Sequence, residues 1–402
     1  MSSHHSHPAI FNLGFRVFFA GAGVFSFISI ACWLVIYASL NGALSIGSVL
    51  AFFEFKTISP FQWHAHEMIY GYSLAVISGF LLTAVKNWTG IQTIHGYPLA
   101  LLFGLWALAR ILWLAGDQYI FIAAFFDIFF IVCLCFAVAS PIIATKQWRQ
   151  MAILSKLFLL GLGNLAFYLE AFSYLEGGIQ LAIYGGLYLV IGLILTIGRR
   201  IIPLFVENGV PYEVSLFNSK WLDMTSLFGF LGFFITEVFL SIDNLSIMFA
   251  GLMFIITSIR IIGWYTPGIW AKPLLWCFYL ALFFIDLGFL LFVLAHLLDI
   301  SPFLSVHAFA VGAIGIITMG MMARVSTGHT GRSLKNIPKT LLLALLILSA
   351  GAVVRVLLPL IAPDFSPIWV LLSGLLWLVS FGLFIFTFLP YWTQARVDQK
   401  YG

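Results

Sequence analysis

The sequence predicts an all-α, polytopic membrane protein with about twelve transmembrane helices and both termini in the cytoplasm. Three observations lead to this fold class: composition, the lengths of the apolar stretches, and the placement of the basic residues. Of 402 residues, 62% are hydrophobic and 8% are charged, and the mean hydropathy is +1.08. A soluble domain carries about 25% charged residues, so the composition excludes a soluble protein.

Twelve apolar stretches are long enough to cross a bilayer core, which takes about 20 residues. In chain order they cover residues 14–40, 66–86, 97–115, 119–144, 151–174, 179–198, 221–240, 245–264, 273–297, 303–323, 339–361 and 368–390. The first stretch is too long for the core of a signal peptide and shows no cleavage pattern before Leu50, so it is expected to be a retained helix.

The segments between the spans are too short to build a core of their own. We therefore expect residues 1–402 to form a single transmembrane helical domain, with residues 1–13 as a mobile cytoplasmic N-terminus. The segment 41–65 is rich in aromatic residues and suits the membrane interface. No convincing internal repeat is visible, which weakens, without excluding, a transporter built from inverted halves.

Basic residues fall almost entirely on one side of the predicted membrane. All but three of the 19 Lys and Arg residues lie on the side of the N-terminus, and the exceptions are Lys56, Arg110 and Arg355. The positive-inside rule then places both termini in the cytoplasm. The net charge of +4 comes from these flanks, so membrane lipid and not nucleic acid is the expected partner.

Four histidines are expected near the outer face. His64 and His66 precede Glu67 at the entry to the second span. If the helix has begun at His64, the two rings point about 200° apart and cannot share one centre, whereas an extended His64 allows them to converge. An interfacial cap of polar groups is the alternative to a metal site.

His296 and His307 flank a short outer turn, so their rings are expected at similar depths on neighbouring helices. Imidazole binds copper and is an axial ligand of haem iron. The four histidines therefore predict one or two metal centres, with His66 and His307 as first choices for iron, and His64 and His296 for copper.

Four carboxylates lie at costly depths in the membrane: Asp127, Asp286, Glu170 and Glu237. They are candidates for a proton route or for supporting a ligating histidine. Glu67 is expected in the first turn of the second span, where the helix dipole favours a carboxylate, and Glu67, Asp127 and Asp286 are the candidate proton carriers. The alternative is a buried pair with Arg110 or Arg355. These two arginines are also candidates for holding haem propionates.

At the inner face, Arg199 and Arg200 end the sixth span, and His329 lies in a glycine-containing segment after the tenth. Basic residues at such ends usually set topology or contact lipid. Backbone amides around His329 offer an alternative role in binding an anion or a propionate.

At this point several motifs resemble, in order, those of the NnrS family, polytopic proteins associated with the bacterial response to nitric oxide. The resemblance runs over roughly the first 335 residues, through Phe11–Arg16, Trp63–Met68, Asn87–Gly90, Gly198–Phe205, His307–Gly315 and Arg324–Arg332. It implies haem and copper, through His64, His66, His307 and His329. The Gly198-Arg199-Arg200 sequence departs from the family, in which a second glycine more often precedes one arginine.

We therefore expect a multi-pass protein of the bacterial inner membrane that holds haem b and copper. It would bind nitric oxide and protect against it, with nitric oxide reductase-like chemistry as the enzymatic hypothesis and an unknown electron donor. A transporter or metal-handling permease, and a haem-holding sensor without turnover, are the alternatives. A conventional haem-copper oxidase motif and a nucleotide-binding glycine loop are absent from the sequence.

Overall fold

The computed structural model describes residues 7–44 and 56–402, and within these residues the chain is all-α, without strands. Twelve helices in this part of the chain are long and apolar enough to cross a membrane. The predicted fold class, an all-α membrane protein with about twelve transmembrane helices, is confirmed.

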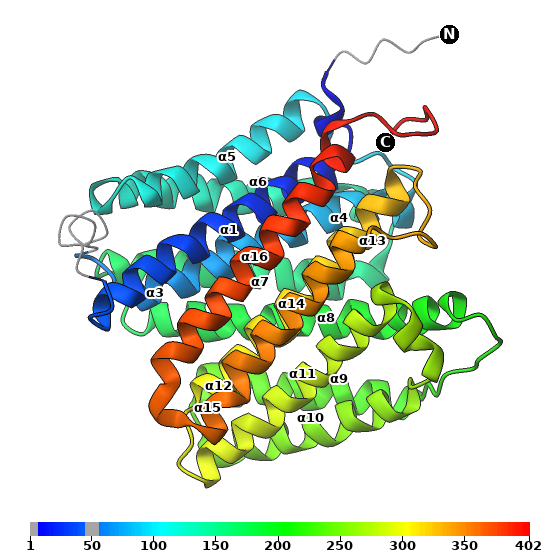
Figure 1. The fold of residues 1–402 in the computed structure, drawn as a ribbon. Coiled ribbons are helices and arrows are strands. Elements are labelled where there is room, and N and C mark those ends of the chain that lie inside the picture. The colour runs from blue at the N-terminus through cyan, green and yellow to red at the C-terminus, as the bar shows by residue number, and fades with distance from the viewer. Residues whose placement is uncertain (1–6, 45–55) are drawn as a thin grey trace. The chain divides into compact units, whose positions relative to one another are not determined.

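The observed spans follow the apolar stretches closely, and most boundaries differ by a few residues (Figure 1). The helices are α1 (Gly14–Leu40), α3 (Pro60–His66), α4 (Leu74–Thr89), α5 (Tyr97–Leu114), α6 (Ile120–Ala144), α7 (Met151–Ala171), α8 (Gly178–Gly209), α9 (Lys220–Ile235), α10 (Asp243–Gly263), α11 (Pro273–Leu297), α12 (Phe303–His307), α13 (Ile316–His329), α14 (Lys339–Val356), α15 (Leu358–Ile361) and α16 (Ser366–Thr393).

Three spans extend well beyond their predicted bounds, by about three turns in α8 and by nearly two turns in the second and tenth spans, the tenth ending at His329 instead of residue 323. α8 continues to Gly209 through Arg199, Arg200 and Pro203, and the second span starts at Pro60 instead of residue 66. The early start has a local cause: Ser59 accepts from the Gln62 backbone amide, and the Gln62 side chain accepts from the Ser59 amide. This capping box, followed by proline at the first helical position, fixes the helix start.

Contacts divide the chain into two compact units. Unit 1 comprises residues 1–186, 321–344 and 378–402, and unit 2 comprises residues 187–320 and 345–377. A single domain over the whole chain stays a prediction. In unit 1, α1 runs beside α4, α5 packs along α6, and α6 contacts α4 and α7 (Figure 1). Together these helices surround the polar site described below.

Parts of two predictions fall on residues outside the described part: the mobility of residues 1–6, and the interfacial position of residues 45–55. From Ala9 onward the N-terminal segment is structured. Residues Ala9–Phe11 form a short 3-10 helix, and Asn12 and Leu13 are buried. The mobile start therefore stays a prediction for residues 1–6.

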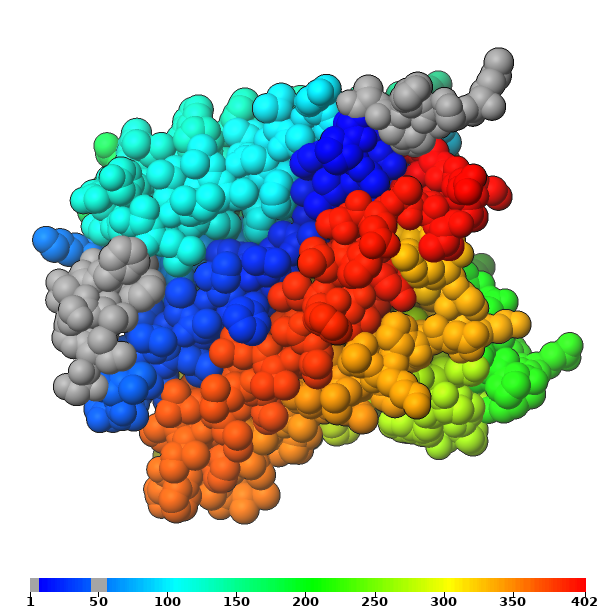
Figure 2. Space-filling view, turned by 45° about the horizontal axis from the view of Figure 1, so that its top comes forward, coloured from blue at the N-terminus to red at the C-terminus, as the bar shows by residue number. Residues whose placement is uncertain are grey.

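The start of α1 and the C-terminal segment are held together by Arg16, which is fully buried. Its guanidinium donates to the backbone oxygens of Tyr391 (3.0 Å), Trp392 (3.1 Å), Gln394 (2.7 Å) and Gly402 (2.7 Å). Figure 2 shows the dark blue start of the chain against this red segment.

A second set of contacts ties the same segment to the end of α13. The Arg396 side chain donates to the His329 backbone oxygen at 2.9 Å, and the Val397 amide donates to the Thr330 oxygen. Arg396 also pairs with Asp398, which holds the pKa of that carboxyl well below its usual range. Because that pKa is lowered, the ion pair persists above the ordinary aspartate pKa and is lost only as the pH falls through the lowered value.

Replacing Arg16 by glutamine is expected to release the C-terminal segment. Backbone oxygens lose a charged donor, and hydrogen bonds to charged groups contribute about 1.5–3 kcal/mol each. We expect faster cleavage between Gln394 and Gly402 in limited proteolysis, together with a lower melting temperature. Lys86→Gln is the comparison, since Lys86 meets the same segment through a weaker cation–π contact, with its Nζ 5.7 Å from the centre of the Tyr401 ring. Equal cleavage rates for the two variants would show that Arg16 does not hold the segment.

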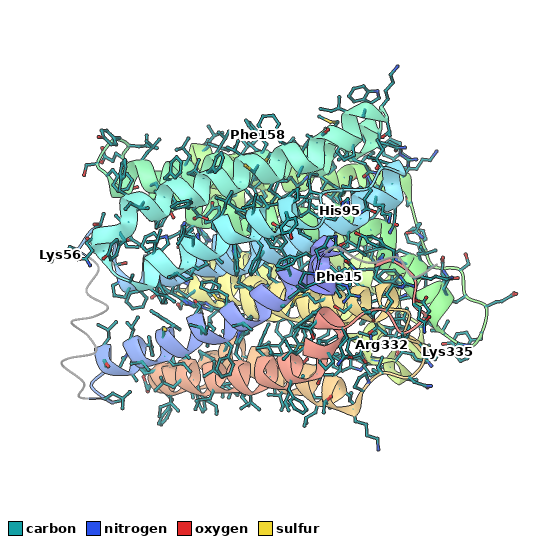
Figure 3. All side chains as sticks on the ribbon, turned by 90° about the horizontal axis from the view of Figure 1, so that it is seen from above. Phe15, Lys56, His95, Phe158, Arg332 and Lys335 are labelled. Atoms are coloured by element: carbon teal, nitrogen blue, oxygen red, sulfur yellow. The ribbon has the colours of Figure 1, made fainter. Side chains whose placement is uncertain are left out.

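The side-chain view separates the two ends of unit 1. Lys56 lies at one end, whereas His95, Arg332 and Lys335 lie at the other (Figure 3). This separation agrees with the uneven charge distribution along the sequence. The cytoplasmic position of the termini stays a prediction.

Candidate functional site

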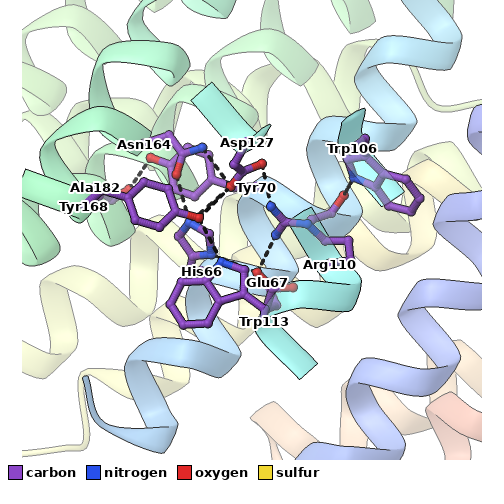
Figure 4. A network of polar contacts seen from close by, with 11 residues as sticks. His66, Glu67, Tyr70, Trp106, Arg110, Trp113, Asp127, Asn164, Tyr168 and Ala182 are labelled. Atoms are coloured by element: carbon purple, nitrogen blue, oxygen red, sulfur yellow. Dashed lines mark hydrogen bonds and ion pairs between the residues drawn. The ribbon is translucent and has the colours of Figure 1, made fainter. Parts of the chain in front are cut away.

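Four charged side chains meet in the interior of unit 1 (Figure 4). His66, Glu67 and Asp127 have no exposed surface, and Arg110 is 2% exposed. They come from α3, from the segment that follows it, from α6 and from α5. Ionisable groups at such depth in a membrane protein are costly and point to a function.

A π-helix places the first two members of this cluster. It covers Glu67–Ser73 and joins α3 to α4 within one span. π-helical turns are rare and occur frequently at functional sites. The wider turn begins directly after His66, and both His66 and Glu67 are buried although they are adjacent in sequence.

The contacts within the cluster are short and complementary in charge. His66 Nδ1 lies 2.9 Å from Glu67 Oε1. Arg110 bridges the carboxylates, with Nη1 on Glu67 Oε1 and Nη2 at 2.5 Å from Asp127 Oδ1. The predicted alternative of a buried pair with Arg110 is therefore observed for Asp127, and Glu67 shares the same arginine.

Asn164 of α7 completes the surroundings of the imidazole. Its Nδ2 donates to Asp127 Oδ2 at 3.1 Å, so its Oδ1 is the atom that faces His66 Nε2, at 2.8 Å. Both ring nitrogens of His66 therefore face oxygen acceptors. Only a doubly protonated imidazole donates to both, so this geometry fits a positively charged His66.

With His66 protonated, two cations balance two carboxylates and the cluster is neutral. Loss of that proton would leave one uncompensated negative charge in a region without exposed surface, which is strongly unfavourable. Charge balance thus explains how four ionisable side chains can lie together with almost no exposed surface.

Aromatic side chains enclose the cluster and extend its hydrogen bonds. Tyr168 donates to Asp127 Oδ2 at 2.9 Å and accepts from Trp113 Nε1 at 2.8 Å. The His66 ring lies 4.3 Å from the Phe167 ring and 5.1 Å from the Tyr70 ring. This apolar enclosure excludes water and strengthens the electrostatic interactions inside.

Four buried polar atoms of the cluster have no hydrogen-bond partner within the described residues: Glu67 Oε2, Asp127 Oδ1, and Nε and Nη2 of Arg110. Asp127 Oδ1 and Arg110 Nη2 still face each other as an ion pair at 2.5 Å, whereas Glu67 Oε2 has neither a hydrogen bond nor an ion pair within these residues. A buried, unsatisfied carboxylate oxygen is costly and requires an explanation. A proton or a small polar ligand at this oxygen would satisfy it.

The residues that sequence reasoning missed are Asn164, Tyr168 and Trp113. Asn164 is a polar residue within an apolar span, and this could have identified it as a candidate site residue. Its pairing with His66 depends on the rotation of α7 against α3, which the sequence pattern does not define.

His64 and His66 point in different directions. Both lie within helix α3, the case in which the sequence predicted that they cannot share a centre. The His64 ring stacks on the Trp33 ring of α1, with ring centroids 4.4 Å apart and planes inclined by 11°. The ligand roles of both residues stay predictions.

His296 and His307 belong to unit 2, whereas His64 and His66 belong to unit 1. Each of the unit 2 histidines directs Nδ1 at the backbone oxygen four residues earlier: Phe292 for His296 (2.9 Å) and Phe303 for His307 (2.7 Å). Arg355 Nη2 lies 3.1 Å from His307 Nε2. Because arginine can only donate, this nitrogen accepts, and His307 is neutral.

The other predicted residues occupy separate places. Asp286 accepts from the Ser258 hydroxyl with both carboxylate oxygens, at 3.2 and 3.0 Å. Arg199 pairs with Asp223 at 3.1 Å, and Arg260 pairs with the same carboxylate at 2.6 Å. The ring of His329 packs on Phe15 at 5.8 Å. Cofactor roles for Arg199, Arg200 and His329 stay predictions.

Within residues 7–44 and 56–402, no three His, Cys, Asp or Glu side chains converge in a way that could hold a metal ion. The fold and the site thus define a class: polytopic α-helical membrane proteins with a buried, charge-balanced histidine–carboxylate–arginine site. More particularly, the chain belongs to the NnrS protein family, because the sequence model of that family matches residues 9–396. A comparison with functionally curated proteins found no match.

Proposed function

We propose that this protein holds haem b and copper in a bacterial inner membrane, binds nitric oxide and protects against it by reducing it. Membership of the NnrS family fits a membrane protein of the nitric oxide response. The observation that carries the enzymatic part is the fully buried quartet of His66, Glu67, Arg110 and Asp127. Reduction of two nitric oxide molecules by two electrons and two protons yields nitrous oxide and water, so it requires a proton supply inside the membrane.

Haem iron and copper each require a histidine nitrogen that presents its lone pair to the metal. A ligating histidine typically donates one ring N–H to a carbonyl, which fixes the tautomer and presents the other nitrogen. His296 and His307 show this pattern through Nδ1. His66 does not, because both of its nitrogens face oxygen atoms. His296 therefore fits as a ligand, whereas the Nε2 lone pair of His307 already accepts from Arg355 at 3.1 Å. His66 fits a proton-holding role.

When bound, haem and copper supply the sites for nitric oxide and for one-electron transfer from an external donor. The chain's own residues hold and deliver the proton. His66 keeps it between Glu67 and Asn164, and Arg110 fixes both carboxylates. When negative charge develops near the cluster, it attracts the proton of His66. Transfer of this proton through Glu67 Oε2 then becomes favourable, because the charge of the proton is balanced outside the cluster.

Absorption spectra of detergent-purified protein test the cofactor proposal. Oxidised and reduced spectra, pyridine haemochrome and metal analysis on one sample should give a Soret band and near whole-number iron and copper. Added nitric oxide should shift the Soret band and be consumed when a reductant is present. Haem absorbance without consumption would favour a sensor. A colourless, metal-free protein from haem-replete cells would overturn the proposal.

The buried quartet also suits a proton-coupled transporter, the second candidate. Proton movement through a membrane carrier uses the same combination of buried histidine, carboxylates and arginine. Protein in liposomes with a pH-sensitive dye inside would reveal it. Substrate-dependent proton flux from a colourless preparation would make transport the leading function.

A further inference from the structure

Four basic side chains lie together at one end of unit 1, and three of them have no carboxylate partner. They are Arg16 at the start of α1, Lys86 near the end of α4, Arg332 after α13 and Arg396 after α16. Within the described residues, their only ion pair is the one between Arg396 and Asp398. Four cations and one carboxylate leave an excess of three positive side-chain charges.

Electrostatic interactions show that these cations are neighbours. Arg332 and Arg396 both act on the Arg16 guanidinium, and Arg396 and Lys86 both act on the ring of His329. Like charges at short separation repel one another, and the repulsion is weakened when an anion lies among them. This end of unit 1 therefore favours the binding of an anion.

Arg16 supplies positive charge from the interior without a side chain that neutralises it. It has no exposed surface, and its Nη atoms donate to backbone oxygens of the C-terminal segment. Its Nε is buried and has no acceptor within residues 7–44 and 56–402. Carbonyl oxygens satisfy donors but leave the charge in place, and a buried charge is costly unless an opposite charge lies near it.

Two cations of the group present N–H donors that no acceptor satisfies. The Arg332 guanidinium lies 4.1 Å from the centre of the Tyr391 ring, and Lys86 Nζ lies 5.7 Å from the centre of the Tyr401 ring. In the described part of the chain, neither side chain forms a hydrogen bond or an ion pair, and Arg332 Nη1 is also buried. A buried donor without an acceptor is costly, so Arg332 in particular calls for one.

The two aromatic rings beneath these cations are fixed to the start of α1. The Tyr391 backbone oxygen accepts from Arg16 Nη1 at 3.0 Å, and the Tyr401 hydroxyl donates to the Asn12 backbone oxygen at 2.9 Å. Cation–π contacts with fixed rings hold Lys86 and Arg332 in place before a ligand arrives. Donors that are already in position lose less freedom on binding.

We propose that Lys86 and Arg332 bind the phosphate of an anionic phospholipid, with Arg16 contributing further positive charge from the interior. A guanidinium binds phosphate through paired N–H donors, and a lysine ammonium binds it as a point charge. Both side chains are half-buried, so a headgroup can reach them from outside.

The position along the helices favours a lipid over a soluble anion. The site lies at the ends of α4 and α13, on the side that the sequence predicts to be cytoplasmic, where basic pockets between helices bind lipid headgroups. Two residues before Tyr391, Leu389 of α16 is 47% exposed and offers apolar surface to an acyl chain. The proposal requires neither haem nor copper, so it stands apart from the proposed function.

Native mass spectrometry of the purified full chain in detergent tests the site. The probes are phosphatidylglycerol, which is anionic, and phosphatidylcholine, which carries no net charge. Phosphatidylglycerol should bind at least about tenfold more tightly than phosphatidylcholine, and its affinity should fall at least about tenfold in Arg332→Gln and in Lys86→Gln. This is the effect of losing one hydrogen bond to a charged group.

Lys335→Gln is the matched control. It removes one positive charge three residues after Arg332, at the same end of unit 1 (Figure 3), from a side chain that is exposed. Its affinity for phosphatidylglycerol should stay within about threefold of the unmodified protein. An equal loss in Lys335→Gln and Arg332→Gln would show attraction by the general surface charge and would overturn the site. Equal binding of the two lipids would overturn it as well.

Inorganic phosphate distinguishes the two sources of a phosphate group. Added alone at the same concentrations, it should leave phosphatidylglycerol bound, because it lacks the acyl chains that hold the lipid against the helices. Displacement of the lipid by inorganic phosphate would overturn the phospholipid and assign the same side chains to a soluble phosphate.

Thermal unfolding gives a second readout that does not depend on how well Arg332→Gln folds. A ligand that binds the native state stabilises it, so phosphatidylglycerol should raise the melting temperature of the unmodified protein and of Lys335→Gln. Lys86 is half-buried and makes no hydrogen bond within the described residues, so Lys86→Gln should fold normally and show no such rise. A rise of equal size in Lys86→Gln would overturn the proposal.

Discussion

Replacing Arg110 by methionine is expected to lower the free energy of unfolding by about 3–5 kcal/mol, because it removes one partner of a buried ion network. Glu67 and Asp127 would remain as carboxylates without exposed surface, opposed by His66 alone. Methionine keeps most of the side-chain volume, so the lower free energy of unfolding would come from the missing charge and not from a cavity. Thermal unfolding in detergent, followed by tryptophan fluorescence or light scattering, measures the change.

Arg199→Met is the matched control, since Arg199 pairs with Asp223 at the surface and both side chains are more than one-third exposed. An exposed ion pair contributes up to about 1 kcal/mol. The double variant Arg110→Met/Asp127→Asn removes one cation and one anion and should recover at least half of the lost stability. If Arg110→Met costs no more than Arg199→Met, the charges of the cluster are not coupled as their distances indicate.

The spans were predictable because the thickness of the bilayer core fixes how many consecutive apolar residues a spanning helix needs, and hydropathy along the sequence shows where such stretches lie. The predicted helix bounds were wrong where local hydrogen bonding, and not hydropathy, sets the end of a helix. The Ser59–Gln62 capping box starts the second span early, and α8 continues past the apolar stretch to Gly209. Hydropathy carries no information about either, because caps and polar helix extensions depend on local hydrogen bonds.

The candidate site was predictable in its residue types and only partly in its contacts. The cost of burial in the membrane marked Asp127, and the position beside His66 in the first helical turn marked Glu67. Charge complementarity made Arg110 an expected partner for a buried carboxylate. The sequence did not locate Asn164 and Tyr168, because their contact with the cluster depends on helix rotation. Nor did it predict the π-helix after His66, which changes the direction of every later side chain in that span.

Replacing His66 by glutamine is expected to lower the rate of nitric oxide consumption by about 100-fold, the lower end of what a positioned proton donor contributes, while nitric oxide binding persists. Glutamine can still bond to Asn164 and Glu67 but carries no exchangeable charge. It also leaves two carboxylates against one arginine, so the melting temperature should fall. Consumption measured with an electrode, alongside the spectrum of the nitric oxide complex, separates turnover from binding. His95→Gln is the matched control outside the cluster, since the His95 ring faces the Thr93 backbone oxygen at 3.1 Å.

The double variant His66→Gln/Glu67→Gln distinguishes proton delivery from charge balance. Asp127 and Arg110 then neutralise one another, as their 2.5 Å contact allows, so stability should return while consumption stays low. If consumption returns together with stability, the quartet is a structural element whose only requirement is neutrality. If stability returns and turnover does not, the His66 proton takes part in the reaction, because the double variant restores the charge balance without restoring that proton.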